Sequence, residues 1–125
     1  YERGEFEAAR IAVDAIEPGD PLREKADRLL ARIELGESAA VAGDRRLLVG
    51  RLERDAADAD AAIGIATIDA AAGDYGSALP RLMPVIARGG EPGNVAKSRV
   101  LTIFRAMDDE DATRHWQQQL ANALY

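Results

Sequence analysis

Few side chains in this sequence could do chemistry. His115 is the single histidine and there is no cysteine, so the chain offers neither a histidine pair nor thiolates for a metal ion, and no cysteine nucleophile. The acidic run at residues 108–111 carries the charge of a calcium site, but it lacks the spaced oxygen ligands and the glycine of a calcium loop. We expect this run to begin a helix, where acids complement the helix dipole.

The acids in the middle of the chain have a similarly simple explanation. Asp55, Asp58 and Asp60 fit a solvated linker followed by a helix cap. The sequence contains no phosphate-binding loop, no dinucleotide-binding fingerprint and no nucleophile elbow. We therefore expect no catalysis, no cofactor and no metal ion in this chain.

Composition narrows the class of partner. The 125 residues carry a net charge of −6, and the basic residues are spread through the chain, which disfavours nucleic-acid binding. No apolar run approaches the roughly 18 residues of a membrane span, and we expect no signal peptide. We expect a single cytoplasmic domain with neither a nucleic-acid nor a membrane partner.

Two similar hexapeptides indicate an internal repeat. Residues 4–9 are GEFEAA and residues 73–78 are GDYGSA, which places Gly73 69 positions after Gly4. This offset is close to twice the roughly 34 residues of a tetratricopeptide repeat. In each hexapeptide, glycine can turn the chain, the acid can cap the next helix, and alanine permits close helix contact. The pattern predicts an all-α array of antiparallel helical hairpins with about seven helices.

Apolar spacing supplies the expected helices. The first covers residues 6–16, the second begins at Pro21 and ends at Gly36, and a weaker, degenerate stretch covers residues 38–54 with a possible break at Gly43 and Asp44. For the second helix we expect a buried stripe of Leu22, Ala26, Leu29, Leu30 and Ile33.

The second half of the chain has the stronger pattern. A nearly apolar central helix is expected at residues 60–72, followed by a partner helix that is either kinked or starts near Pro80, because Pro80 and Pro84 disturb it. We expect a loop at residues 89–93 and a helix with its stripe at residues 96–107. The last helix should bury Ala112, Trp116, Leu120, Ala123 and Leu124.

Three segments resemble one family. They are AAAGDYGSALPRLMPVI, then AKSRVLTIF at residues 96–104, then WQQQLANALY at residues 116–125. In this order they are similar to the C-terminal tetratricopeptide region of thioredoxin-like co-chaperones of the YbbN type, the chaperedoxins. Trp116 stands where the family usually has tyrosine, and Gln117 and Gln118 stand where arginines are common.

The resemblance implies a partner and a missing domain. Family members hold unfolded client proteins and pass them to the chaperonin or to Hsp70, and they carry an N-terminal thioredoxin-like domain. Because the chain starts at Tyr1, almost directly on a repeat motif, we expect it to be the C-terminal part of a longer protein. Two other roles remain open, a regulatory or assembly scaffold unrelated to thioredoxin and an accessory domain of an enzyme.

Two surfaces are candidate protein-binding sites. In the repeat register, a helix starting near Ala59 would face a concave groove with small, mostly apolar side chains. The residues of this set are Asp60, Ile63, Thr67, Ala70 and Ala71. The alternative is that they pack against neighbouring helices. By family analogy the last helix could dock on a chaperonin through Trp116, Leu124 and Tyr125, although Trp116 could equally belong to the core.

Overall fold

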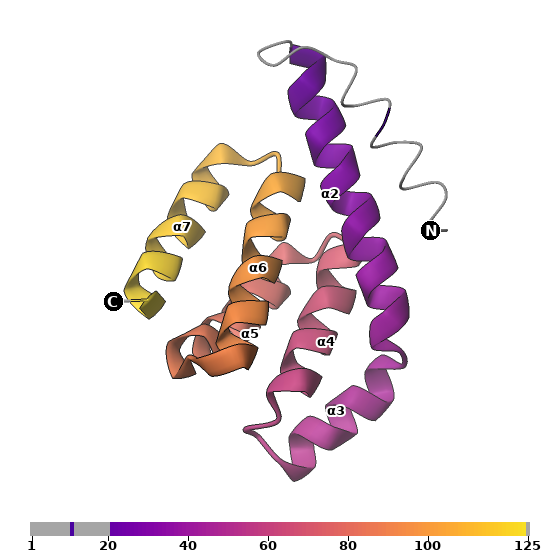
Figure 1. Ribbon diagram of the computed structural model, residues 1–125, viewed down its shortest axis with the longest axis vertical. Coiled ribbons are helices and arrows are strands. Elements are labelled where there is room, and N and C mark those ends of the chain that lie inside the picture. The colour runs from indigo at the N-terminus through magenta and orange to yellow at the C-terminus, as the bar shows by residue number, and fades with distance from the viewer. Residues whose placement is uncertain (1–10, 12–20, 125) are drawn as a thin grey trace.

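The computed structural model describes Ile11 and residues 21–124, and the part described from Pro21 onward is built from helices (Figure 1). No strand occurs among these residues, which confirms the all-α prediction. The expected helix at residues 6–16 and the first hexapeptide lie outside the described residues, apart from Ile11. The helices are α2 (Pro21–Ala42), α3 (Arg45–Arg54), α4 (Ala59–Ala71), α5 (Tyr75–Arg88), α6 (Gly90–Ala106) and α7 (Glu110–Leu124).

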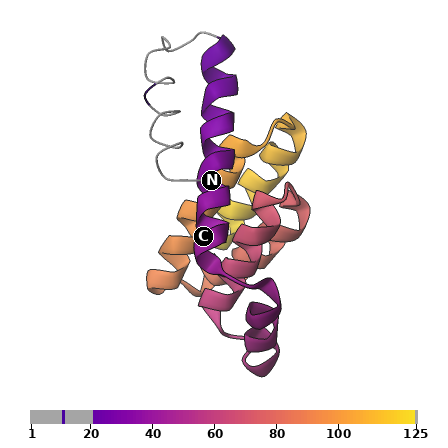
Figure 2. The ribbon, with the colours of Figure 1, turned by 90° about the vertical axis from the view of Figure 1, so that its right-hand side faces the viewer.

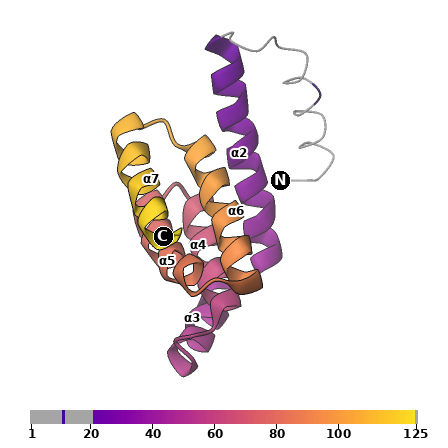
Figure 3. The same cartoon turned by 60° about the vertical axis from the view of Figure 1, so that its left-hand side comes forward.

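Short connections fold α4, α5 and α6 into an antiparallel stack, as in a helical repeat array. α5 packs on α4, α6 and α7, while the short α3 packs on α4 at one end of the molecule (Figures 1 and 3). The long α2 lies along one side and packs on both α4 and α6 (Figure 2). One helix therefore contacts two helices of the stack.

The hinge predicted for the second hexapeptide is present. Gly73 has a φ of 87°, a backbone conformation that glycine adopts without strain. Asp74 then caps α5, since its carboxylate accepts a hydrogen bond of 3.2 Å from the Ser77 N–H. Ala78 is completely buried where α5 meets its neighbours. The α4–α5 joint thus confirms the expected use of glycine, acid and alanine.

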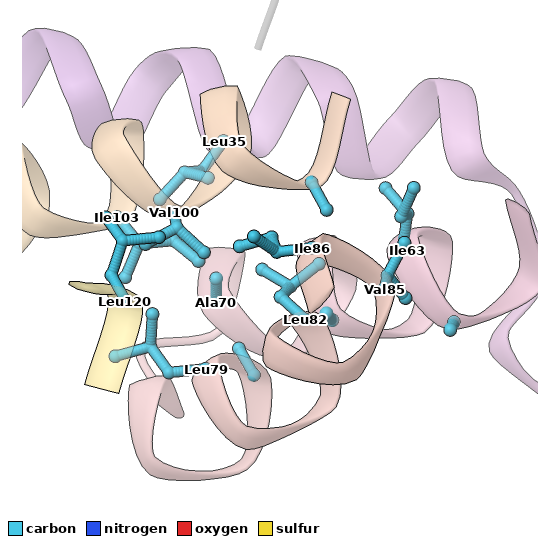
Figure 4. Close-up of a cluster of buried hydrophobic side chains, with 14 of the residues drawn as sticks. Leu35, Ile63, Ala70, Leu79, Leu82, Val85, Ile86, Val100, Ile103 and Leu120 are labelled. Carbon is cyan, nitrogen blue, oxygen red and sulfur yellow. The ribbon is translucent and has the colours of Figure 1, made fainter. Parts of the chain in front are cut away.

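The core is formed by small and branched side chains from five helices (Figure 4). α4 is buried on nearly all sides, as expected from its apolar sequence. Alanines at these contacts let the helix backbones approach closely. The largest fully buried apolar side chains are Leu35, Ile65, Leu79, Leu82, Ile103, Val85 and Val100.

The predicted end of α2 is wrong, and its predicted buried stripe is wrong in part. The helix does not end at Gly36 but continues to Ala42, where Gly43 at φ 94° ends it. Of the predicted stripe, Ile33 is buried and Ala26 and Leu30 are half-buried, but Leu22 and Leu29 are 60% and 56% exposed. The face toward the core carries Ala31 and Leu35. At about 100° per residue, Leu22 lies on the opposite side of the helix from Ala31. The small Ala31 suits the alanine-rich α4, so the contact does not follow the largest apolar side chains.

The expected loop before α6 is also wrong in part. The helix starts at Gly90, so Pro92 and Gly93 belong to its first turns. Proline is tolerated there because the first N–H groups of a helix have no partner within the helix. Gly93 is buried, and a Cβ at this position would come within 3.3 Å of the Val85 carbonyl oxygen. Gly93 therefore allows α6 to approach the backbone of α5.

The two prolines do not interrupt α5. The helix begins at Tyr75, which excludes a start near Pro80, and it runs through Pro80 and Pro84 to Arg88. Both prolines are exposed, so water can bind the carbonyl groups that they leave without a partner. None of the described helices has the length and apolar character needed to cross a bilayer.

Candidate functional site

Most of the set predicted on α4 is buried. Ile63, Thr67 and Ala70 are at most 8% exposed, whereas Asp60 and Ala71 are exposed. The α2 residues Ala31 and Leu35 belong to the same core cluster as Ile63 and Ala70. In this arrangement the three buried side chains have the packing role, which leaves Asp60 and Ala71 accessible to a partner.

The second predicted surface lies on α7, the last described helix. Trp116 is half-buried against the core, and its ring meets the His115 ring edge-on with centroids 5.1 Å apart. Leu124 is 41% exposed, unlike the buried position expected from the stripe. Tyr125 lies outside the described residues. α7 packs mainly on α5, so much of its surface is accessible.

A groove that the sequence did not predict lies between α2, α6 and α7, with a volume of about 510 Å³. We call it the α2/α6/α7 groove. Its floor contains Phe104 and Met107, both half-buried against the core. Its charged lining comprises the acids Glu24, Asp27, Asp108, Asp109 and Glu110 and the arginines Arg28, Arg105 and Arg114, with Thr113 and Gln117 completing it.

One wall of this groove is fixed by hydrogen bonds and ion pairs between α2 and the end of α6. The Arg32 guanidinium donates a hydrogen bond of 3.1 Å to the Ala106 carbonyl and lies 3.7 Å from Asp108. A cation at the C-terminal end of a helix also complements the helix dipole. Arg105 of α6 lies 3.8 Å from Glu34 of α2. These contacts hold α2 against α6 beside the groove.

The acids of the groove differ in their partners. Asp109 caps α7 by accepting a hydrogen bond of 3.0 Å from the Ala112 N–H, and α7 starts at Glu110, which confirms that the acidic run begins a helix. Asp27 pairs with Arg23 on its own helix at 3.2 Å. Glu24 and Glu110 have no ion pair within the part of the chain that the structure describes. Their charges are thus available to an incoming cation.

The groove is not predictable from the sequence, because its walls come from distant segments. Glu24 and Asp27 lie about 80 residues before Asp108, and only the packing of α2 on α6 brings them to one site. Phe104 and Met107 belong to the apolar stripe predicted at residues 96–107, but that stripe does not show that they line a groove. The described residues contain no group of His, Asp and Glu side chains that could hold a metal ion.

The other mid-chain acids act structurally. Asp58 caps α4, since its carboxylate accepts a hydrogen bond of 3.0 Å from the Ala61 N–H, and it pairs with Arg51 of α3 at 3.1 Å. The backbone hydrogen bond from Ala61 and the pairing with Arg51 lower the pKa of Asp58. At the other end of α4, Arg45 pairs with Asp69 at 2.9 Å. Both pairs join α3 to α4.

The stacked antiparallel helices are those of a helical-repeat protein. The tetratricopeptide repeat profile matches residues 38–125, which is more than half of the chain. The chain therefore belongs to the tetratricopeptide repeat family. Its domains bind protein partners and are in general not catalytic. No curated protein and no solved structure matches the chain.

Proposed function

We propose that this chain is the protein-binding part of a thioredoxin-like co-chaperone that works in the cytoplasm. It holds unfolded client proteins and docks on the chaperonin or on Hsp70. The proposal also includes a thioredoxin-like domain encoded upstream of Tyr1. The family fold supports the general role, and the resemblance of three segments to chaperedoxins supports the particular one.

The observation that carries the proposal is the end of the sequence, WQQQLANALY at residues 116–125. Residues 116–124 of this segment form more than half of α7, at the edge of the helical stack. Gln117, Gln118 and Asn122 are exposed, and Leu124 adds an exposed apolar side chain beside this uncharged face. Such a combination of apolar and neutral polar groups suits a protein interface. We assign docking to Trp116 and Leu124 of α7 and to Tyr125, which lies outside the described residues.

Client holding is tested by light scattering with the full-length protein. A client that aggregates on heating should aggregate less when the protein is present at several-fold molar excess, because exposed apolar segments of the client would be covered. Equal aggregation with and without the protein would refute the holding function. The coding sequence upstream of Tyr1 gives an independent check. A segment unrelated to thioredoxin there would refute the proposal that the chain is part of a thioredoxin-like co-chaperone.

Docking through α7 is tested with two matched variants. Leu124 and Val95 are both 41% exposed, but Val95 lies on α6. Leu124→Glu should reduce the recovery of chaperonin in a pull-down, whereas Val95→Glu should leave it unchanged. Equal recovery with both variants would exclude Leu124 from the docking surface.

A further inference from the structure

We propose that the α2/α6/α7 groove binds a short basic peptide segment that carries one bulky apolar residue. The inference rests on the proposed function only in that the bound molecule is a segment of a protein. It goes further by assigning the site and the chemistry of the segment. Part of the site lies outside the matched family region, because Glu24 and Asp27 precede residue 38.

Charge is the first reason for a basic segment. The lining has five acids and three arginines, so the groove is negative, as is the whole chain at −6. Glu24 on α2 and Glu110 on α7 lie on opposite walls, and neither has an ion pair among the described residues. A lysine or arginine between the walls could interact with either carboxylate. An acidic segment would be repelled.

The floor is the second, independent reason. Phe104 and Met107 present half-buried apolar surface at the base of the groove. Aromatic and thioether groups pack well against aliphatic and aromatic side chains, and an aromatic ring also attracts a cation over its face. A bulky apolar residue of the segment would cover this floor while the flanking basic residues meet the walls.

The size of the groove fits a short segment. A volume of about 510 Å³ lies within the range of roughly 300–1,000 Å³ that is common for binding pockets. This accommodates a few side chains and not a whole folded partner. The contacts from α2 to the end of α6, Arg32 to Ala106 and Arg105 to Glu34, keep one wall in place without a ligand. This wall is therefore in place before binding.

The test uses the full-length protein and fluorescence anisotropy with a short labelled peptide in which lysines and arginines flank a central leucine. We expect saturable binding that weakens as salt is raised, because salt screens the exposed charges. Replacing the basic residues by glutamate, or the leucine by serine, should each weaken binding. Failure of the basic peptide to bind, or equal competition by free arginine, would overturn the proposal.

Matched variants separate the groove from the overall negative charge. Glu24→Gln combined with Glu110→Gln removes two charges from the groove, while Glu53→Gln combined with Glu91→Gln removes two exposed charges elsewhere. The groove variant should bind the peptide about fivefold to tenfold more weakly, and the control variant should bind within about twofold of the parent. Equal weakening in both would overturn the groove assignment. Thermal unfolding by circular dichroism checks that both variants fold.

The peptide-binding test of the groove and the aggregation test of client holding can fail independently of each other. If the parent protein suppresses client aggregation but does not bind the basic peptide, the groove proposal fails and the co-chaperone function stands. If the peptide binds with the expected variant effects but aggregation is not suppressed, the groove proposal stands and client holding fails.

Discussion

Thr67 shows how a polar side chain is accommodated in the core of α4. Its hydroxyl donates a hydrogen bond of 2.7 Å to the Ile63 carbonyl oxygen one turn earlier, so burial leaves its donor satisfied. The whole residue is only 1% exposed. A threonine at this position is therefore compatible with complete packing and needs no external partner.

Lysine substitutions on α4 test which of its residues are accessible. Thr67→Lys should lower the free energy of unfolding by about 3 kcal/mol or more, because a charge would be buried without a partner. Ala71→Lys, at an exposed position of the same predicted set, should change it by less than about 0.5 kcal/mol. Urea denaturation measures both values. A small effect of both substitutions would mean that the Thr67 side of α4 is open to solvent.

Gly93→Ala tests whether the close approach of α6 to α5 requires a glycine. Alanine there would press a methyl group toward the Val85 and Ile86 carbonyl oxygens, at 3.3 and 3.4 Å. Gly93→Ala should lower the free energy of unfolding by about 1 kcal/mol, because this strain exceeds the gain in helix propensity.

Gly50→Ala is the matched control for Gly93→Ala. Gly50 lies within α3, and the nearest atom to an added Cβ is the end of the Arg54 side chain at 3.7 Å. This substitution should raise the free energy of unfolding by about 0.5–1 kcal/mol. Equal stabilisation by both substitutions would show that α5 and α6 can separate to accept the methyl group.

Local residue roles were the easiest to predict. Gly73, Asp74 and Ala78 act as expected, because turn formation, capping and close helix contact depend on neighbours in sequence. The exposure of Ile63 and Thr67 could not be predicted in the same way. Helical register gives the side of α4 on which they lie, but only the tertiary structure tells which helix covers that side.

At the scale of elements, Asp58 joins the start of α4 to α3. Its carboxylate accepts a hydrogen bond from the Ala61 N–H and pairs with Arg51 at 3.1 Å. The hydrogen bond and the ion pair both favour the ionised form, so the pKa of Asp58 is lowered in the folded state. The resulting stabilisation is complete above the ordinary carboxyl pKa of about 4 and is lost as pH falls through the lower, folded-state pKa.

Asp58→Asn should therefore destabilise the protein in a pH-dependent way. Asparagine can still cap α4, but it cannot form the ion pair with Arg51. Urea denaturation should show a less stable variant at neutral pH, with the difference from the parent shrinking as the pH is lowered below about 4. Asp60→Asn, which removes an exposed neighbouring carboxylate that has no ion pair with Arg51, is the control for the loss of one negative charge and should destabilise the protein less at neutral pH. A difference that stays constant with pH would contradict the assigned role of the Asp58 charge.

Helix boundaries could be predicted where strong stop signals occur. Gly43 and Asp44 separate α2 from α3, and Gly73 lies in the short connection between α4 and α5. The predicted end of α2 at Gly36 is wrong, because a glycine inside a helix lowers its stability by only about 1 kcal/mol. Packing of α2 on α4 outweighs that cost, and an isolated sequence does not reveal this contact.

At the scale of the whole molecule, α2 determines which surfaces are accessible. It packs on α4 and α6, covers part of the stack, and supplies one wall of the α2/α6/α7 groove. The array of hairpins was predictable from repeats and helical periodicity. The position of α2 across two helices was not, because it depends on contacts between residues far apart in sequence.

The central claim is that this array binds segments of other proteins at α7 and at the neighbouring groove. Hydrogen–deuterium exchange with mass spectrometry, on the full-length protein with and without a saturating unfolded client, tests it most directly. We predict slower exchange in the first half of α2, the end of α6 and α7, with α3 unchanged. Exchange that is identical along α2–α7 with and without the client would contradict the account.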